Sequence, residues 1–416
     1  MKPQVDFEGL VPSALFDIPG ALGPDRPDLG EDGVHGDRNI DGQNNESMPA
    51  HLRALYLRPR GQVRAAHVRS AAATGLQALA VTHRVATPAG WRSIADLATN
   101  DLVFGINGTA TAVTETSPVY RGLPCFEVSF DDGQKIRAAA SNSWTVQTRN
   151  GHDSDYVQFT ATTEELATMK RSRRSAISIP LAIRESPSLQ LPIDPYLFGY
   201  WLGDGYAANG AFAVGNADVE EVTAILQKVL LPYEIITSKY YAYNLCHHLN
   251  VRNIKKPSRV SPEQSLFQRL RTLGVLYNKH VPELFLLAGT EQRRSLMQGM
   301  IDSDGNVTSD GQIKFTNTNR RIIDGFLEVC RSLGYKPSAR VHTTSGWVVS
   351  FQAIDAEPVA RIQRKATRVK LGGRIGSRRY IQSITPIEPV PVKSVGFATQ
   401  GLIFQVEGGI ATHGAW

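Results

Sequence analysis

Two apolar segments that contain closely spaced small residues stand out in the hydrophobic pattern of the chain. Residues 197–205 read Leu-Phe-Gly-Tyr-Trp-Leu-Gly-Asp-Gly, and residues 297–305 read Met-Gln-Gly-Met-Ile-Asp-Ser-Asp-Gly. In each segment two small residues lie four positions apart, which places them on one face of a helix and lets two helices approach closely. Glycine after the last turn is a usual helix end. The pattern therefore predicts Asp204 and Asp304 at the matching ends of two touching helices.

A similar order of elements follows each segment. After the first segment the pattern predicts a strand over 211–216 and a helix over 218–229. After the second it predicts a strand over 312–317 and a helix over 320–333. Because both halves read helix, strands, helix, the sequence indicates an internal repeat with pseudo-twofold symmetry.

The flanks of this repeat have the short alternating runs and turn residues that are typical of β-strands. A hairpin is predicted over 124–138 with its turn at Asp132-Gly133. A short helix leads into a strand over 94–105. Two strands joined by a Pro-Ala-Gly turn are predicted over 84–91, and further strands over 143–148, 379–390, 392–397 and 402–406. The two ends of the chain are thus expected to form a compact β-rich domain.

The beginning of the chain has a different texture. Residues 1–50 are rich in Pro, Gly, Asp and Asn and are predicted to be irregular, while 49–73 have a basic, helical pattern. No phosphate-binding loop and no recognisable catalytic motif occur there. The apolar stretch of a signal peptide is also missing, and no run of the chain approaches transmembrane length.

The composition of the chain excludes few classes of function. The chain has 416 residues, enough for two or three domains, and an ordinary apolar fraction of 42%. Three widely spaced cysteines predict neither a disulfide framework nor a zinc site, so a reducing, cytoplasmic setting is expected. The formal net charge of +6 permits nucleic-acid binding but does not argue for it alone.

The expected closeness of Asp204 and Asp304 suggests a chemistry. Two adjacent carboxylates repel each other, which raises one pKa unless a divalent cation lies between or beside them. Oxygen ligands suit Mg²⁺, which can position water and stabilise charge on a phosphate. Two amphipathic helices that happen to end in Asp-Gly are the alternative, and the presence of two copies in similar surroundings favours the cation site. Asp302, two residues before Asp304, is expected at the surface.

The twin segments resemble the two motifs of the LAGLIDADG homing endonucleases. The resemblance implies a pseudo-twofold αββα domain, a monomer that cuts a long asymmetric site in double-stranded DNA with Mg²⁺, and a metal site formed by Asp204 and Asp304. It also implies Lys279, in the stretch 279–286, and Lys314 as charges near the cleaved phosphates, with ordinary surface lysines as the alternative. Polar residues over 240–245 and 314–319 would then face the DNA.

The flanks resemble the Hint splicing domain of an intein. Residues 82–105 are similar to its first block and residues 131–146 to its second, while the end of the chain, 409–416, is similar to its last block. The resemblance implies a β-rich horseshoe that the endonuclease-like part interrupts. The expected boundaries are listed together: 1–77 for the upstream host fragment, 78–190 and 377–414 for the two parts of the splicing domain, 191–376 for the insert, and 415–416 for a downstream stub.

The upstream splicing position departs from most inteins. Ala78 occupies the first position and cannot act as a nucleophile. A minority class of inteins starts without a nucleophile, carries a Trp in the second block and uses a Cys near the C-terminus. Trp144 matches that Trp, but Ser394 stands at the position of the Cys. A serine hydroxyl is a far weaker nucleophile than a thiolate at neutral pH.

The downstream junction is altered as well. His413 matches the imidazole that assists cyclisation of an asparagine, but Gly414 replaces that asparagine and Ala415 replaces the downstream nucleophile. In the second block, Asn142 stands about where a His is usual. A splicing-disabled precursor explains these losses more simply than a misaligned motif does. Splicing needs no cofactor, and its substrates are the host-protein flanks in cis.

Taken together, the sequence predicts an intein, with blocked splicing, that carries a homing endonuclease able to mobilise its own gene. Two other readings stay open. One is a DNA-binding protein of the same fold that has lost its metal chemistry, and the other is a host enzyme represented by residues 1–77. Cation-dependent DNA cutting separates the first from the prediction.

Overall fold

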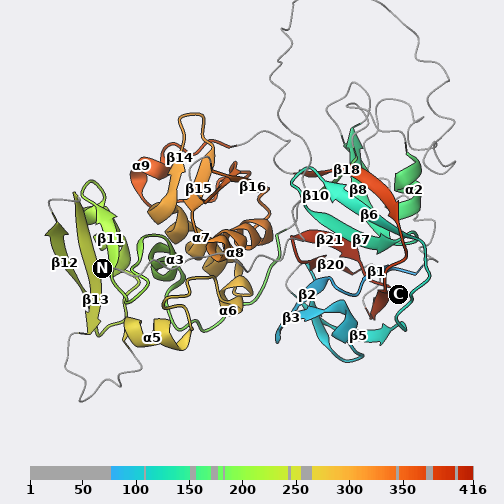
Figure 1. Ribbon diagram of the computed structural model, residues 1–416, viewed down its shortest axis with the longest axis horizontal. Coiled ribbons are helices and arrows are strands. Elements are labelled where there is room, and N and C mark those ends of the chain that lie inside the picture. The colour runs from blue at the N-terminus through green and yellow to red at the C-terminus, as the bar shows by residue number, and fades with distance from the viewer. Residues whose placement is uncertain are drawn as a thin grey trace, which may run out of the picture. The chain divides into compact units, whose positions relative to one another are not determined.

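Figure 1 shows the computed structural model of the chain. The ranges that the structure describes are 76–106, 109–149, 156–169, 177–180, 183–241, 245–253, 265–342, 346–371, 378–398 and 402–415. The predictions for residues 1–50 and 49–73 lie outside these ranges. None of the described helices is long and apolar enough to span a bilayer.

Strands from both ends of the described chain build a β-rich body. Blue and teal strands from the first part and red strands from the last part run through it in Figure 1. Its strands are β1 (Ala78–Ala80), β2 (Arg84–Thr87), β3 (Gly90–Ser93), β4 (Leu102–Phe104), β5 (Ala110–Thr116), β6 (Cys125–Phe130), β7 (Lys135–Ala139), β8 (Ser143–Arg149), β9 (Tyr156–Thr162), β10 (Ile177–Pro180), β18 (Arg378–Ile387), β19 (Val392–Phe397), β20 (Ile403–Val406) and β21 (Ile410–His413). A 3₁₀ turn, η1 (Ile94–Asp96), and the helix α2 (Thr163–Thr168) complete it.

Antiparallel pairing of sequence-distant strands closes this body. Within the described residues, one sheet has the strand order β4-β5-β19-β1-β7-β6-β18-β10-β8-β9, and a smaller sheet has the order β21-β20-β2-β3. Strand β1 pairs with β19, β6 with β18, and β2 with β20, so strands from the last part of the described chain lie between or beside strands from its first part. This pairing confirms the predicted β-rich fold made from the two ends of the chain.

The central part of the chain forms a second body with its own core. Its helices are α3 (Pro195–Asp204), α4 (Val219–Gln227), α5 (Leu266–Thr272), α6 (Glu283–Leu286), α7 (Thr290–Asp304), α8 (Arg320–Ser332) and α9 (Gln363–Ala366). Its strands are β11 (Phe212–Gly215), β12 (Glu234–Tyr241), β13 (Cys246–Asn253), β14 (Gly305–Val307), β15 (Ile313–Asn317), β16 (Ser338–Val341) and β17 (Trp347–Phe351).

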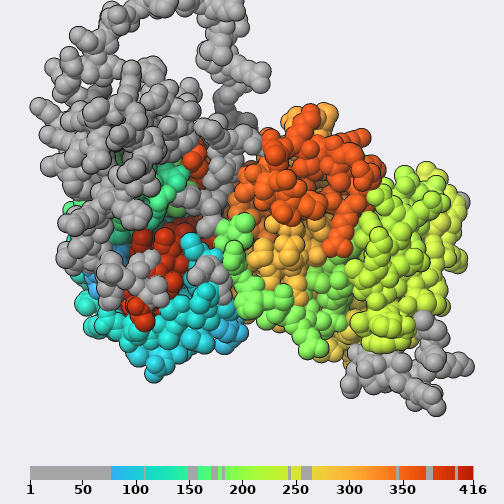
Figure 2. Space-filling model, turned by 180° about the vertical axis from the view of Figure 1, so that it is seen from behind, coloured from blue at the N-terminus to red at the C-terminus, as the bar shows by residue number. Residues whose placement is uncertain are grey.

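The predicted internal repeat is confirmed. The first half runs α3, β11, α4 and then the hairpin β12–β13, and the second runs α7, β14, β15, α8 and then the hairpin β16–β17. Each half has its own sheet, ordered β11-β13-β12 and β14-β15-β17-β16. Figure 2 shows the two halves next to each other, the first in yellow-green and the second in orange. The terminal hairpin of each half is an element that the αββα prediction did not specify.

Helices α3 and α7 pack against each other through their glycines. A Cβ added at Gly199 would lie 2.2 Å from the carbonyl oxygen of Leu296, and one added at Gly299 would lie 2.2 Å from that of Tyr196. The backbones therefore touch at both positions, as the spacing of small residues predicted. The helix pair lies in the centre of the larger core cluster, where nearly every residue of α3 is buried.

The local sequence explains where α3 begins and ends. At the start of α3, the Asp194 carboxylate accepts hydrogen bonds from the amides of Tyr196 and Leu197 at 2.9 and 3.1 Å. Such a side-chain cap satisfies amides that the first turn leaves without partners. At the other end, Gly205 has a φ of −76°, so a left-handed conformation is not what requires glycine there. A Cβ at Gly205 would lie 2.2 Å from the carbonyl oxygen of Trp201, and that close approach is the reason.

The helix contact makes a direct prediction for stability. Gly199→Ala is expected to lower the free energy of unfolding by about 1–3 kcal/mol, because the added methyl group has to push α7 away from α3. That loss opposes the ~1 kcal/mol that alanine gains over glycine in helix propensity. Thermal and urea unfolding of the two proteins measures the difference.

Gly215→Ala is the matched control, because nothing lies within 4 Å of a Cβ added at Gly215 in the same half. We expect this variant to unfold within about 0.5 kcal/mol of the parent. An equal effect of both substitutions would contradict close packing of the two helices.

Candidate active site at the paired helix ends

Asp204 and Asp304 are the last residues of α3 and α7. A Cβ added at Gly203 would lie 3.2 Å from the carboxyl carbon of Asp304, so the second carboxyl group lies directly against the end of the first helix. On its other side, Asp304 Oδ2 accepts a hydrogen bond of 2.6 Å from the Asn317 side-chain amide. The structure thus brings the two predicted carboxylates together.

The surroundings of these carboxyl groups disfavour their charged forms. Burial, and next to it the charge of Asp304, raise the pKa of Asp204 to about 7. Burial also raises the pKa of Asp304, while the hydrogen bond from Asn317 acts in the opposite direction. A carboxyl group whose pKa lies near physiological pH is a usual mark of a functional site. A divalent cation would remove the penalty by compensating both charges.

Two lysines support the two helix ends. Lys279 Nζ donates to the carbonyl oxygens of Trp201 and Leu202 at the end of α3, at 2.9 and 3.1 Å. Burial lowers the pKa of Lys279 to about 8, although both aspartates raise it. Lys365 Nζ donates to the carbonyl oxygen of Ile301 at the end of α7, at 2.8 Å. Cations are favourable at helix C-termini because the free carbonyls carry negative partial charge.

Lys365 is a site residue that the sequence analysis missed. It belongs to α9, more than sixty residues after α7, in a stretch rich in Arg and Lys where no spacing distinguishes it. Its pKa is lowered by burial, and its charge lowers the pKa of both Asp204 and Asp304. Only the fold brings it to the helix ends.

Lys314 lies on the strand that pairs with the residues following Asp304. It lies on β15, opposite Asn306 and Ser350, and its charge lowers the pKa of the exposed Asp310. Among the described residues, the lysines that shift the pKa of Asp204 or Asp304 are Lys279 and Lys365.

The expectation that Asp302 lies at the surface is wrong. Its side chain is 2% exposed. Asp302 Oδ2 accepts hydrogen bonds from the Tyr196 hydroxyl at 2.9 Å and from the Arg361 amide at 2.8 Å. The turn of α7 before Asp304 faces α3 and the chain leading into α9, a packing arrangement that the local sequence did not reveal.

One face of each sheet carries polar side chains. In the first half, most residues of β12 and β13 are half-buried or exposed, while Glu234 and Leu249 are buried. Residues of these strands and of the segment before β11 line a cavity of about 520 Å³; they are Tyr206, Asn209, Ala211, Thr237, Ser238, Lys239, Tyr241, His248, Asn250 and Arg252. The Tyr241 and His248 rings stack at 4.0 Å between centroids. Cationic, amide and aromatic groups on one face are what nucleic-acid surfaces use.

The second sheet offers a different set of outward groups. Lys314 and Thr316 of β15 share a face with Ser350 of β17 and Arg340 of β16, as the strand registers require. Ile313 and Phe315 point the other way and are fully buried. The two halves therefore repeat the fold but not the surface chemistry.

In the β-rich body, two of the predicted splicing positions lie on neighbouring strands inside the larger sheet. Ala78 of β1 lies directly opposite Ser394 of β19 in the strand register. Ser394 is 4% exposed, its amide donates to Ser117 Oγ at 2.9 Å, and its hydroxyl has no hydrogen-bond partner among the described residues. The hydroxyl is thus held beside the predicted upstream junction, opposite a residue that has no reactive group.

The downstream positions lie next to this pair. The amide of Ala415 donates to the carbonyl oxygen of Val395, at 2.8 Å. His413 Nε2 lies 2.7 Å from the Thr145 hydroxyl, and burial lowers the pKa of His413, which favours the neutral imidazole. A Cβ added at Gly414 would lie 2.3 Å from the Phe397 ring, so a side chain there requires that ring to move.

Two second-block residues support the same region. The Asn142 side-chain amide donates to the Thr412 hydroxyl at 3.3 Å, beside His413. Trp144 is buried in the core of the β-rich body, and its indole N–H donates to the Thr163 hydroxyl at 2.9 Å. Sequence-distant segments thus meet at one place, as a splicing site requires.

Known proteins share parts of this chain. Residues 291–375, which include Asp304, match the family model of the LAGLIDADG-like domain. In a match of 350 aligned residues that covers 77% of the chain, the sequence is 29% identical to the replicative DNA helicase DnaB of Mycobacterium intracellulare. The chain spans about half (55%) of that protein. The replicative DNA helicase DnaB of Mycobacterium leprae is 36% identical over 68 residues, which are 16% of this chain and 11% of that protein.

Two solved structures are similar to separate parts of the chain. The MchDnaB-1 intein is 31% identical, with 24% of this chain and 65% of that chain covered and a TM-score of 0.19. I-DmoI in complex with DNA and Ca is 13% identical, with 42% and 95% covered and a TM-score of 0.31. The chain combines an intein-type Hint domain with a LAGLIDADG-type insert.

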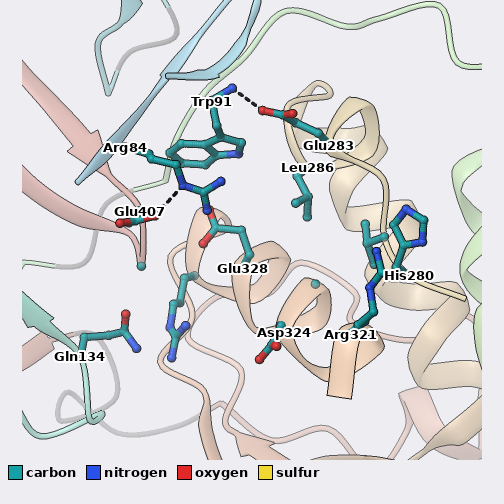
Figure 3. Close-up of a pocket in the computed structure, with 14 residues that line it drawn as sticks. Arg84, Trp91, Gln134, His280, Glu283, Leu286, Arg321, Asp324, Glu328 and Glu407 are labelled. Atoms are coloured by element: carbon teal, nitrogen blue, oxygen red, sulfur yellow. Dashed lines mark hydrogen bonds and ion pairs between the residues drawn. The ribbon is translucent and has the colours of Figure 1, made fainter. Parts of the chain in front are cut away.

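A second cavity, of about 520 Å³, is lined by residues of both the Hint domain and the LAGLIDADG insert. Figure 3 shows its charged groups, with Arg84 bonded to Glu407 and the Trp91 amide bonded to Glu283. Arg84 Nε lies 2.8 Å from the Glu407 carboxylate, and Glu328 pairs with Arg184 at 3.2 Å. Asp324 pairs with Arg320 at 2.8 Å, so three of the four acids that line this cavity have an arginine partner, and the fourth, Glu283, accepts from a backbone amide.

Proposed function

We propose that the LAGLIDADG insert is a site-specific endonuclease that cuts both strands of a long DNA site, carried by an intein whose host is a replicative DNA helicase. The observation that carries the proposal is the pair Asp204 and Asp304, held together at the ends of two touching helices with both pKa values raised. Two equivalent carboxylates, one from each half of the pseudo-twofold repeat, suit the cutting of the two antiparallel strands of DNA. The similarity of the chain to two replicative DNA helicases supports this host.

Asp204 and Asp304 are the residues that would hold Mg²⁺. Their oxygens are the hard ligands that Mg²⁺ prefers, and their raised pKa values indicate a site that gains from an added positive charge. When bound, such a cation supplies activation of a water molecule and stabilisation of charge on the phosphate. Lys279 and Lys365 hold the helix ends in place and offset part of the negative charge.

The polar faces of the two sheets would bind the DNA. Lysines and arginines neutralise phosphates, which makes the affinity fall as salt increases. Amide, hydroxyl and imidazole groups such as those of Asn250, Thr237 and His248 have the donors and acceptors that base edges require. Since the two sheets present different groups, one monomer suits an asymmetric target.

The test is cutting of a defined plasmid. Supercoiled DNA that carries the uninterrupted host gene, with the codon of residue 77 joined to that of residue 415, is incubated with the protein and Mg²⁺. We expect linear DNA with Mg²⁺ and intact DNA with EDTA. A plasmid with the gene interrupted by the intein sequence is the control and should stay intact. Binding without cutting would identify a DNA-binding protein and contradict the nuclease.

We also propose that splicing is blocked in this chain. Residues 1–77 would be the upstream host fragment, 78–190 and 377–414 the two parts of the splicing domain, 191–376 the insert, and 415–416 the downstream stub. Ala78 and Gly414 lack the reactive groups of the two junctions, and Ser394 supplies a hydroxyl in place of a thiol. The protein would act in the cytoplasm, where the host protein and its gene are found together.

A further inference from the structure

The twin helices differ at one buried position. Asp302 of α7 stands where the matching motif of α3 has Leu202. Leu202 is fully buried, and Asp302 is 2% exposed. A carboxylate in an apolar interface costs free energy unless hydrogen bonds compensate for the lost water. The hydrogen bonds of Asp302 therefore indicate why α7 has an acid where α3 has a leucine.

Asp302 fastens the start of α9 to α7. Its Oδ2 atom accepts hydrogen bonds from the Arg361 amide at 2.8 Å and from the Ile362 amide at 3.2 Å, just before the helix. The Tyr196 hydroxyl of α3 donates to the same oxygen at 2.9 Å. One carboxylate thus joins both central helices to the backbone that leads into α9.

The side chain of Arg361 strengthens this attachment. It donates to the Gln298 amide oxygen at 2.8 Å and to the Ser295 hydroxyl at 2.7 Å. Ser295, Gln298 and Asp302 lie three and four residues apart, so they form one polar stripe along α7. The stripe holds the segment 361–366, which we call the α9 segment.

The α9 segment returns Lys365 to the end of α7. Lys365 is 3% exposed, and its Nζ donates to the carbonyl oxygens of Ile301 and Asp302 at 2.8 and 2.7 Å. The side chain of Asp302 thus binds the α9 segment, and Lys365 of that segment binds the backbone carbonyl of Asp302 in return. Both contacts lie at the last turn of α7, which carries Asp304.

The α9 segment is also attached to the first half. Arg364 Nε donates to Asp218 Oδ1 at 2.6 Å, and the Gln363 amide donates to Glu221 Oε1 at 2.8 Å. Lys279, the counterpart of Lys365, has a different support, because the Asn319 side-chain amide donates to its carbonyl oxygen at 2.9 Å. The two lysines therefore reach matching helix ends by unrelated means.

We propose that Asp302 is a positioning residue for the nuclease: it anchors the α9 segment so that Lys365 stays at the end of α7 beside the two catalytic carboxylates. The proposal rests on the proposed endonuclease function for its effect on cutting, but not for the anchoring itself. Asp302 is buried beneath the α9 segment and acts through Lys365.

The anchoring has an unequal effect on the two carboxylates. Lys365 donates to carbonyl oxygens at the end of α7, which carries Asp304, whereas Lys279 donates to carbonyl oxygens at the end of α3, which carries Asp204. Displacing Lys365 therefore loosens the support of one carboxylate more than that of the other. An enzyme that cuts two strands then cuts one of them more slowly, and nicked DNA accumulates.

The first arm of the test measures anchoring without DNA or cation. Hydrogen exchange of the amides of Arg361 and Ile362 is followed in the parent and in Asp302→Leu, which installs the residue of the matching motif. We expect exchange at least about 10-fold faster in the variant, because both amides lose their acceptor. Glu291→Leu, at an exposed acid on the same helix, is the control and should exchange as the parent does.

The second arm measures cutting of each strand of the target. Asp302→Leu and Lys365→Met are expected to slow the same strand by about 10–100-fold and to accumulate nicked DNA. Lys279→Met is expected to slow the opposite strand. A loss of structure alone would slow both strands equally and would not follow this pattern.

Asp302→Asn covers the case in which the leucine variant does not fold, because its amide oxygen still accepts hydrogen bonds. It should show a smaller increase in exchange and a weaker strand bias of the same sign. Parent-like exchange at both amides in a folded Asp302 variant would overturn the proposal, as would equal slowing of both strands. A parent protein that cuts no DNA would contradict the nuclease alone, and the exchange arm would still decide the anchoring.

Discussion

Asp204→Asn is expected to abolish DNA cutting while DNA binding remains and the folded protein becomes more stable at pH 8. The asparagine removes a charged ligand of the cation, so we expect the cutting rate to fall by at least about 100–1,000-fold. Binding persists because the polar faces of the sheets are unchanged. Plasmid cutting and a salt-controlled binding assay measure the two effects separately.

The gain in stability follows from the raised pKa of Asp204. Burial and the neighbouring Asp304 raise this pKa from 3.8 in the unfolded chain to about 7 in the folded protein. A group of this kind contributes stability below pH 3.8 and loses that contribution as pH rises through 7. At pH 8 the parent carries the full penalty and the variant does not. We expect the variant to be more stable by about 1–2 kcal/mol, a discounted value for a partly accessible site.

Two comparisons check the cause of this gain. Asp310→Asn, at an exposed acid of the same insert whose pKa is lowered rather than raised, should leave cutting unchanged and should bring no gain in stability at pH 8. Added Mg²⁺ should raise the melting temperature of the parent, because a ligand that binds the folded state stabilises it, and should have little effect on Asp204→Asn. A variant that still cuts at the parental rate, or a stability gain that is as large at pH 4 as at pH 8, would contradict the assigned role.

The second large effect is expected in splicing. Ser394→Cys together with Gly414→Asn and Ala415→Thr should change an unspliced chain into one that excises residues 78–414. Cysteine restores a thiolate opposite Ala78, asparagine restores cyclisation beside the neutral His413, and threonine restores the downstream hydroxyl. Mass spectrometry of the purified products detects the excised intein.

Ser394→Cys alone separates the two junctions. It should release residues 1–77 when a small thiol is added, since this step does not require the Phe397 ring to make room at position 414. Ser394→Ala with the other two substitutions is the control and should leave the upstream junction intact. Release of residues 1–77 from the parent chain would show that splicing chemistry is not blocked.

The repeat and its acids were predictable because their signals are local. Small residues four apart, a following Asp-Gly and a second copy place Asp204 and Asp304 together without knowledge of the rest of the fold. The hairpin at Asp132-Gly133 was likewise predictable from its turn residues, and the structure confirms it as β6 and β7. In these places local pattern and tertiary packing agree.

The supporting residues were not predictable because their partners are distant in sequence. Lys365 reaches the end of α7 across some sixty residues, and nothing in its own neighbourhood indicates that contact. Asp302 has the sequence pattern of an exposed acid, yet the α9 segment covers it. Strands as short as β1 and β21 carry too few residues for an alternating pattern, and their pairing across the chain defines them.

The most direct test of the central claim maps the cut in each strand. DNA that carries the uninterrupted insertion site is labelled on one strand or the other and incubated with Mg²⁺ and the parent, Asp204→Asn or Asp304→Asn. We expect one cut per strand with the parent and no double-strand break with either variant. Uncut DNA with the folded parent at saturating binding, or double-strand breaks with either variant, would contradict a nuclease built on these two carboxylates.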